Sequence, residues 1–208
     1  MPPPLAGRRA LVTGCSRRVG IGFAIADRLA SLGADLEVHA FRPYDAEMPW
    51  GADGGGLEPL LDELRRHGTD VHGLEDDLAA PGAPERVVAS ASNRQVGAAG
   101  PHLDIVVANH TYSTMGGLGD LEGDEIDRHL AVNVRATLLL VQAFAAQHDD
   151  RPGGRVVLLT SGQQSAPMPG ELAYVASKGA LVPLAKSLSA ALAPRGVTVN
   201  AVNPGATD

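Results

Sequence analysis

The chain has 208 residues, of which 44% are hydrophobic and 20% charged, proportions that are ordinary for a single globular domain. Its formal net charge of −7 argues against nucleic acid or an anionic membrane as a partner, because phosphate groups attract basic surfaces. No apolar run reaches the roughly 18 to 20 residues of a membrane-spanning helix. The start "MPPPLAGRRA" lacks the apolar core of a signal peptide, and the single cysteine, Cys15, has no partner for an internal disulfide. These features together predict a cytoplasmic protein.

Short apolar runs alternate with longer amphipathic segments along the chain. The short runs predict six strands, at residues 8–14, 35–41, 70–78, 103–110, 154–162 and 196–205. Apolar residues at helical spacing predict helices at residues 22–34, 57–68, 83–97, 125–148 and 171–193, the first of them ending at Gly33. The Pro- and Gly-rich residues 42–56 are expected to form a surface loop.

This alternation is typical of parallel strands joined by crossover helices. The strands are apolar almost throughout, as expected when helices cover both faces of the sheet. We therefore expect one α/β domain over residues 1–208, a doubly wound parallel sheet (Rossmann fold) with three α-β-α layers. Ligands of such folds bind at the carboxyl ends of the strands.

The stretch "LVTGCSRRVGIGFAIA" places three glycines (Gly14, Gly20 and Gly22) between a predicted strand and a predicted helix. Glycines there let the backbone approach a pyrophosphate, and the helix N-terminus offers free N–H groups. The spacing does not match G-x-G-x-x-G, so a glycine-rich bend needed only for packing is the alternative.

Tyr174 and Lys178 are four residues apart, so on a helix they share one face. Ser161 lies at the end of a predicted strand, where the same cleft would open. An ammonium group lowers the pKa of a nearby tyrosine, and a serine hydroxyl can hold a carbonyl while the tyrosine transfers its proton. Taken alone, the tyrosine–lysine pair is better explained as a common helical pair on a solvated face.

The segments "TG…GIG", "YVASK" and "NPG", with Ser161 between them, resemble the short-chain dehydrogenase/reductase family over essentially the whole chain. The resemblance implies that Tyr174 is the general acid–base, that Lys178 lowers its pKa and binds the nicotinamide ribose, and that Ser161 orients the substrate carbonyl. It also implies that Asn133, through its backbone, helps to hold a water next to the lysine. The implied cofactor contacts are Gly14, Ser16, Arg17, Arg18, Gly20, Ile21, Gly22, Arg42, Asp77, Leu78, Asn109, Tyr174, Lys178, Pro204 and Gly205. No metal is expected.

The cofactor preference depends on the end of the second strand, where members that prefer NAD usually carry an acidic residue. Ala40 occupies this position, and Arg42 follows it. Arg17 and Arg18 lie near the same edge of the adenosine, so we expect NADP rather than NAD. The alternative is that Arg42 is a solvated loop residue.

The chain departs from the family pattern in two places. Five residues, two more than usual, separate Gly14 from Gly20, and "ANHT" stands in place of N-N-A-G. His110 and Thr111 thereby replace an alanine and a glycine. We expect His110 to be satisfied within its turn, and a contact with the cofactor is the alternative.

The resemblance implies hydride transfer between a nicotinamide and a carbonyl or secondary alcohol of a small molecule, and subfamily likeness points to a 3-oxoacyl thioester reductase. A catalytically silent cofactor-binding sensor or partner subunit is the alternative. Family members commonly form dimers or tetramers through the helices that here carry Asn133 and Tyr174. They also continue into a lid helix and a seventh strand, so we expect six of the usual seven strands and a chain that is C-terminally incomplete.

Overall fold

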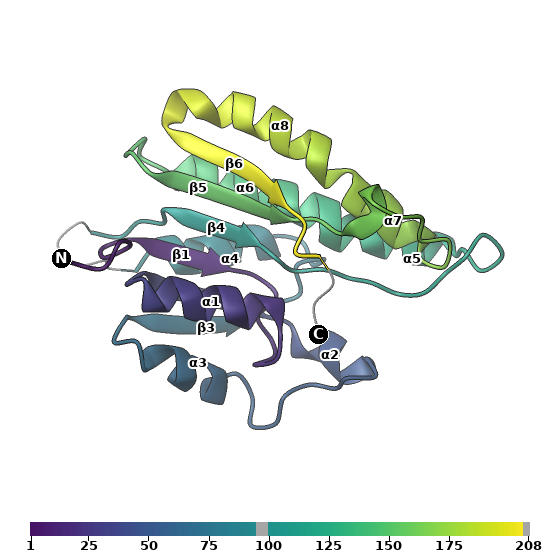
Figure 1. Cartoon of the computed structure of the whole chain (residues 1–208), viewed down its shortest axis with the longest axis horizontal. Helices are drawn as coiled ribbons and strands as arrows, with labels where there is room; N and C mark the ends of the chain where they lie inside the picture. The colour runs from purple at the N-terminus through teal and green to yellow at the C-terminus, as the bar shows by residue number, and fades with distance from the viewer. Residues whose placement is uncertain (95–99, 206–208) are drawn as a thin grey trace.

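A six-stranded parallel sheet forms the centre of the structure, a computed structural model that describes residues 1–94 and 100–205 (Figure 1). The strand order is β3-β2-β1-β4-β5-β6. The strands are β1 (Arg9–Val12), β2 (Asp35–Ala40), β3 (Val71–Glu75), β4 (Ile105–Ala108), β5 (Gly154–Leu159) and β6 (Val197–Val202). The order reverses between β1 and β4, where connections leave in opposite directions and a crevice opens at the carboxyl ends of the strands.

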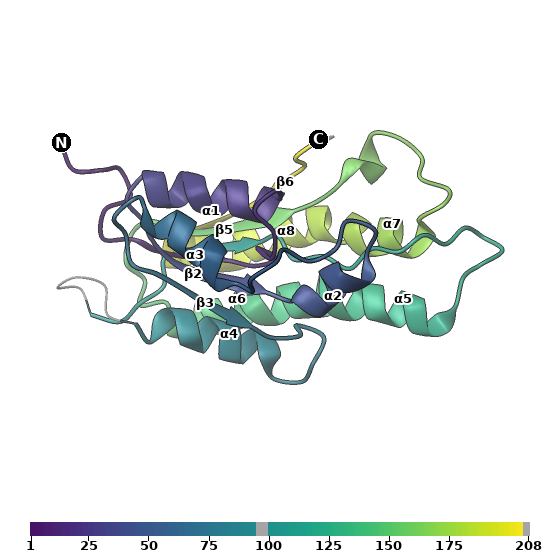
Figure 2. The ribbon, with the colours of Figure 1, turned by 90° about the horizontal axis from the view of Figure 1, so that it is seen from below.

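Helices cover the sheet on both faces, as Figure 2 shows edge-on. On one side lie α1 (Ile21–Ser31) and α3 (Glu58–Arg65), and on the other lie α4 (Ala83–Ser92), α6 (Ala136–Gln147) and α8 (Leu181–Leu192). Alternate residues of each strand serve the two layers: Val12 and Val38 belong to the core under α1 and α3, whereas Leu11 and Val106 belong to the core under the other three helices. The expected doubly wound α/β fold is confirmed.

The segment expected to be a loop contains a short helix, α2 (Arg42–Glu47). Pro43 lies in its first turn, where a missing N–H costs nothing and the fixed φ favours a helix. The residues that follow, 48–56, remain irregular as expected. The Pro- and Gly-rich composition of this segment therefore did not indicate its short helix.

Two predicted helices are each divided in the structure. Residues 125–148 correspond to α5 (Gly123–Leu130), a π-helical turn at Ala131–Arg135, and α6. Residues 171–193 correspond to α7 (Leu172–Gly179) and α8, next to Pro183, which has no N–H to donate to Gly179 four residues earlier. The predicted helix 83–97 ends at Ser92, and its residues 95–97 lie outside the described part of the chain.

Contrary to the expectation from sequence, Gly123–Gln147 forms a helical stretch of 25 residues that by length and composition alone could cross a membrane. Its apolar residues have a place in the fold, since Leu140 and Phe144 are fully buried against the sheet and α4. Packing therefore accounts for the apolar character of this helix.

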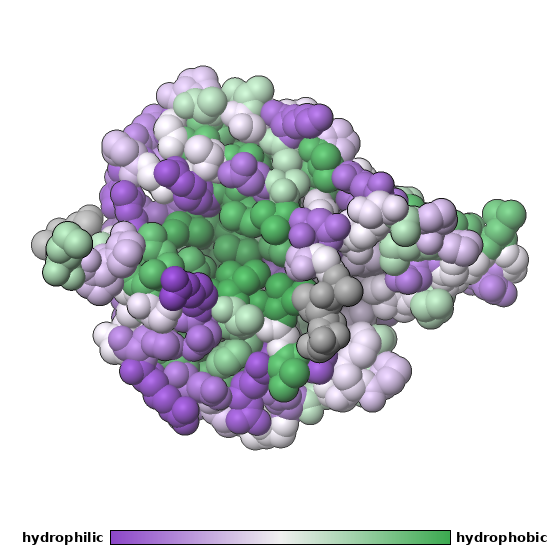
Figure 3. Space-filling view, viewed as in Figure 1, coloured by the Kyte–Doolittle hydropathy of each residue, from purple (hydrophilic) through white to green (hydrophobic). Residues whose placement is uncertain are grey.

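The face of β5 and β6 that lies beside α1 is exposed to solvent (Figure 1). Figure 3 shows apolar surface in the middle of this view. Val157 is half-buried and Val202 is 43% exposed, whereas Val156 and Val199 on the opposite face are buried under the helices. Among the described residues no helix covers this part of the sheet.

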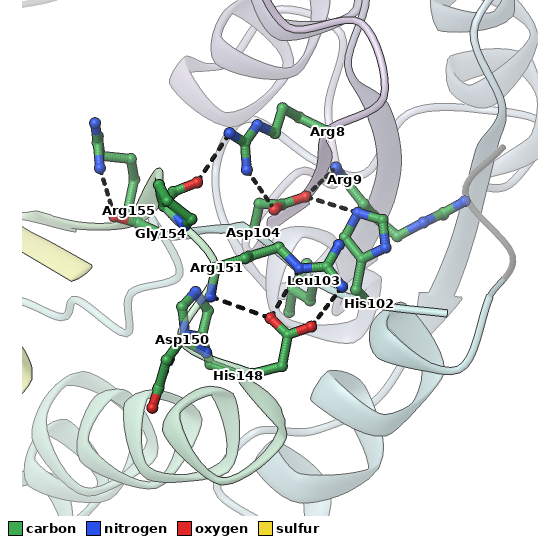
Figure 4. Close-up of polar contacts among 12 residues, drawn as sticks. Arg8, Arg9, His102, Leu103, Asp104, His148, Asp150, Arg151, Gly154 and Arg155 are labelled. Atoms are coloured by element: carbon green, nitrogen blue, oxygen red, sulfur yellow. Dashed lines mark hydrogen bonds and ion pairs between the residues drawn. The ribbon is translucent and has the colours of Figure 1, made fainter. Parts of the chain in front are cut away.

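A network of charged residues closes the amino ends of the strands (Figure 4). Asp104, just before β4, is fully buried and accepts hydrogen bonds from Arg8 Nη1 at 2.8 Å and from the Arg9 backbone N–H at 3.0 Å. His102 Nε2 lies 3.0 Å from the same carboxylate. This network lies at the edge of the sheet opposite to the crevice.

Candidate active site

The glycine turn after β1 is shaped by close contacts on both sides. Gly14 has a φ of +68°, and a Cβ there would lie 2.7 Å from the Cα of His110. A Cβ on Gly22 would lie 2.5 Å from the carbonyl oxygen of Gly14 and 2.8 Å from Asn109 Nδ2. Only glycine fits these two positions.

The same turn leads into a helix N-terminus that can bind an anion. Gly20 is the N-cap of α1, and within the described residues no side chain caps this helix. Its first-turn N–H groups therefore remain available for a phosphate group, with the positive end of the helix dipole behind them. This geometry fits the pyrophosphate of a dinucleotide.

The lengthened turn, which has two more residues than usual, contacts the segment after β2 through three of its residues. Ser16 Oγ accepts a hydrogen bond from the Phe41 N–H at 3.2 Å. Arg18 donates to Asp53 Oδ2 from its backbone at 2.8 Å and from Nε at 3.3 Å. The Arg17 guanidinium lies over the ring of Trp50, 5.5 Å from its centroid. The lengthened turn is thus anchored over its whole length.

Lys178 and Tyr174 lie on α7, and Ser161 lies beyond the end of β5. Lys178 is only 3% exposed and donates from Nζ to the Leu159 carbonyl at 3.0 Å, and burial lowers its pKa to about 8. Burial raises the pKa of Tyr174, Glu171 adds to the rise, and a hydrogen bond with Ser161 opposes it. The pKa of Tyr174 is therefore raised, and not lowered by Lys178 as expected, because burial outweighs the effect that lowers it.

Asn133 lies in the π-helical turn, and its side chain is fully used within the protein. Its Oδ1 accepts from the Tyr112 N–H at 2.8 Å, and its Nδ2 donates to the Tyr112 carbonyl and to Ser177 Oγ, both at 2.9 Å. Ser177 Oγ in turn donates to the carbonyl of Tyr174 at 2.9 Å. Asn133 therefore fixes the helix that carries Tyr174 and Lys178.

A cavity of about 410 Å³ at the carboxyl ends of the strands brings most of the expected residues together. Its lining includes Gly14, Ser16, Arg17, Gly20, Ile21, Gly22, Asp77, Leu78, Asn109, Ser161, Tyr174, Lys178, Pro204 and Gly205. Three expected residues do not line it, namely Asn133, Arg18 and Arg42. Asn133 is buried behind the wall, and Arg18 is paired with Asp53.

Arg42 forms an ion pair with Glu75. The pairing follows from strand register, because Ala40 lies opposite Glu75 and the two strands end together. The guanidinium therefore already has a carboxylate partner beside the cavity, which weakens its expected role toward a 2′-phosphate.

Sequence reasoning missed part of the wall, which comes from the segment expected to be a surface loop. Tyr44, Asp45 and Trp50 of this segment line the cavity, together with Phe41 from the end of the predicted strand before it. The Tyr44 hydroxyl donates to the Ser113 carbonyl at 3.0 Å and accepts from its N–H at 3.2 Å, which joins α2 to the turn after β4. The signal was present as three aromatic residues within "FRPYDAEMPW", in a chain with only 3% aromatic residues.

The turn after β4 adds further residues that the sequence did not single out. Tyr112 packs 5.5 Å from Tyr44 between ring centroids, and the Arg128 guanidinium lies 4.4 Å from the centroid of Tyr112. His39, on β2, also lines the cavity, and its Nδ1 faces the Gly14 N–H at 3.4 Å. Both ring nitrogens of His110 are hydrogen-bonded within the protein, but to Thr13 and Val132 and not within its own turn as expected, and His110 also lines the cavity.

Comparison with known proteins identifies the family. A family model described as short chain dehydrogenase matches residues 8–208. The uncharacterized oxidoreductase YjdA of Bacillus subtilis (strain 168) is 37% identical over 201 residues, which are 96% of this chain and 74% of that protein. A short-chain dehydrogenase/reductase from Serratia marcescens has a TM-score of 0.84 at 36% identity and matches 99% of this chain and 76% of its own.

A short chain dehydrogenase from Burkholderia cenocepacia J2315, solved in complex with NADP, has a TM-score of 0.82 at 36% identity. The match covers 98% of this chain and 76% of that one. This chain thus spans about three quarters of the length of these three proteins. It belongs to the short-chain dehydrogenase/reductase family of NAD(P)-dependent oxidoreductases.

Proposed function

We propose that the chain uses NADP to interconvert a carbonyl group and a secondary alcohol in a small molecule. One observation carries the proposal: Ser161, Tyr174 and Lys178 line the same cavity as the uncapped N-terminus of α1. A proton-transfer group and a dinucleotide site therefore face one cavity.

Each side chain of the proposed site has a separate role in the reaction. The nicotinamide, when bound, supplies or accepts the hydride. Tyr174 is protonated at neutral pH and can give its proton to a carbonyl oxygen in the direction of reduction. The Ser161 hydroxyl lines the same cavity as Tyr174 and is placed to bind the same oxygen. Lys178, whose ammonium lies in the same wall, stabilises the tyrosinate left after the transfer.

The preference for NADP rests on Ala40 and Arg17. Ala40 ends β2 without a carboxylate that would repel a 2′-phosphate. Arg17 lines the cavity and lies over the face of Trp50, with no acidic partner among the described residues, whereas Arg18 and Arg42 are paired with acids outside the lining. Asp45 also lines the cavity, but it accepts a hydrogen bond from Trp50 Nε1 at 3.0 Å. NADP bound to the Burkholderia cenocepacia neighbour supports the same choice.

The proposed substrate is an uncharged carbonyl compound, and a 3-oxoacyl thioester is one member of the class. We also propose that the chain forms a homo-oligomer, a dimer or a tetramer, through α6 and α8. A shallow apolar hollow lies between these helices, lined by Leu138, Leu139, Val141, Gln142, Ala145, Leu188, Ala191 and Leu192. We place the protein in the cytoplasm, in keeping with its buried free thiol at Cys15.

Fluorescence titration with NADPH and NADH, followed by turnover of a carbonyl panel, tests the proposal. We expect tighter binding of NADPH, and a loss of turnover of about 10²–10⁴-fold in Tyr174→Phe with nucleotide affinity retained. Tyr44→Phe is the matched control, because its hydroxyl bonds the Ser113 backbone instead of Ser161. Nucleotide binding without turnover in the unaltered chain would instead support a silent sensor, and no nucleotide binding by the folded chain would refute both.

A further inference from the structure

His110 connects two parts of the site that are far apart in sequence. Its ring is buried, with Nδ1 at 2.7 Å from Thr13 Oγ1 at the end of β1. Its Nε2 lies 3.1 Å from the carbonyl of Val132 in the π-helical turn. One imidazole thus spans the distance from the glycine turn to the helix that carries Asn133.

The chemistry of the partners fixes which nitrogen carries the proton. A carbonyl oxygen can only accept, so Nε2 must donate to Val132. Burial, aided by the nearby His39 and Lys178 and opposed by the hydrogen bond to Val132, lowers the pKa of His110 to about 3, so the ring is neutral. Nδ1 therefore accepts a hydrogen bond from the Thr13 hydroxyl at 2.7 Å, in preference to the Val107 carbonyl 3.2 Å from the same oxygen. The Thr13 oxygen in turn accepts the backbone N–H of Asn109 at 3.1 Å.

The π-helical turn explains why Val132 needs this donor. In an α-helix the N–H of Ala136 would donate to Val132, four residues earlier. Here it donates to Ala131, five residues earlier, and Val132 loses that partner. The imidazole replaces it, so the π-helical turn next to Asn133 depends on a side chain from the turn after β4.

The two ends of the connection are both functional parts of the proposed site. On one side, His110 packs against the dinucleotide turn, since a Cβ on Gly14 would lie 2.7 Å from His110 Cα. On the other side, Asn133 follows Val132 and holds Ser177, which bonds the carbonyl of Tyr174. Hydrogen bonds, together with the peptide bond between Val132 and Asn133, therefore connect the dinucleotide turn through His110 to the proton-transfer helix.

We propose that His110 is a positioning residue that couples the dinucleotide turn to the helix carrying Tyr174, by acting as the donor that the π-helical turn requires. This inference rests on the proposed function for its consequence in catalysis, but the coupling itself is a property of the folded chain. The alanine that family members usually have at this position could form neither side-chain bond.

Three variants of the full chain separate this role from simple packing. His110→Ala removes both bonds, whereas the amide of His110→Gln can still donate to Val132 from a similar place. His148→Ala is the control, because His148 is equally buried but lies at the end of α6, at the opposite edge of the sheet. All three are compared by amide hydrogen exchange without nucleotide.

We expect His110→Ala to speed exchange by about tenfold in residues 13–16 and, together with it, in residues 131–137. His110→Gln restores the second segment, and His148→Ala alters neither. Faster exchange at only one end, or an equal effect in the control, would overturn the proposal. These readouts need no cofactor, so they remain decisive if the chain proves not to bind NADPH.

Nucleotide binding and turnover then test the consequence. If the unaltered chain binds NADPH and turns over, His110→Ala should raise the Kd for NADPH and lower kcat, each by about tenfold, with recovery of kcat in His110→Gln. A change in thermal stability alone, as in His148→Ala, would show that His110 only fills space.

Discussion

Three arginines near the cavity look alike in sequence, but their partners differ. Arg42 is paired with Glu75 and Arg18 with Asp53, and only the third, Arg17, lines the cavity. Its guanidinium lies over Trp50, and no acceptor in the described part of the chain pairs with its donors. The partners thus single out Arg17 as the group available for a 2′-phosphate.

The first prediction follows from this difference. Arg17→Ala should weaken NADPH binding by about tenfold or more, because one charge-assisted hydrogen bond to a phosphate is lost. NADH, which lacks the 2′-phosphate, should bind almost as before, and Arg42→Ala should change neither affinity by a comparable amount. Fluorescence titrations of the three proteins measure these affinities, and a larger effect at Arg42 would contradict the assignment.

Lys178 gives the second prediction, which concerns pH. Its pKa is lowered from 10.5 to about 8 by burial, so between these values the unfolded chain binds more protons than the folded one. The free energy of unfolding therefore rises with pH across this window, and below it the buried ammonium costs about 3 kcal/mol.

Lys178→Met removes the charge at similar length, at the expense of the hydrogen bond to Leu159. We expect the variant to be more stable at pH 7 by about 2 kcal/mol, with the advantage shrinking as the pH rises past 8, and to lose turnover. Urea unfolding at several pH values measures it. An advantage that is constant with pH would show that the ammonium is not destabilised by burial.

At the scale of elements, α2 is held in place by contacts with distant segments. Six residues cannot form a stable helix by propensity alone. The Tyr44 hydroxyl bonds both backbone groups of Ser113, and Asp45 accepts from Trp50. The position of α2 over the cavity therefore depends on a few side chains.

The third prediction tests this dependence. Tyr44→Phe keeps the ring but removes both bonds to Ser113, so exchange of the amides in α2 and at Ser113 should become faster by about tenfold. Residues in α3, which packs on the sheet without Tyr44, serve as the internal control. Unchanged exchange in α2 would mean that the aromatic contacts alone hold it.

At the scale of the whole molecule, Asp104 joins the amino ends of separate segments. It is fully buried and bonded to Arg8 and Arg9 of the first strand region, with His102 beside it (Figure 4). Removing one member of such a buried cluster leaves charges without compensation, which costs more than the cluster itself contributes.

The fourth prediction is that Asp104→Asn lowers the free energy of unfolding by about 3–5 kcal/mol, as measured with urea at pH 7. Asp149→Asn is the matched control, since Asp149 pairs with Arg151 at the exposed surface and should matter far less. Because the network lies opposite the cavity, the nucleotide affinity of the folded Asp104→Asn variant should be unchanged. Equal losses in the two variants would show that burial at Asp104 is not the cause.

The sequence by itself determined the layers of this protein and most of its site. Apolar periodicity is a local property, so it predicted six strands and their helices, and the motif residues Gly14, Ser161, Tyr174 and Lys178 do line one cavity. Strand ends are set by local pattern, and in a parallel sheet all carboxyl ends meet at one edge. That geometry explains why residues from distant motifs converge.

Only the tertiary structure decided which charges are available and how the elements are held. The pairing of Arg42 with Glu75 depends on the register of β2 and β3, and α2 is joined to the turn after β4 by the bond between Tyr44 and Ser113. The pKa of Tyr174 rises because burial outweighs its neighbours, and the role of His110 depends on a π-helical turn more than twenty residues away. These properties come from contacts between segments far apart in the chain, which no local pattern records.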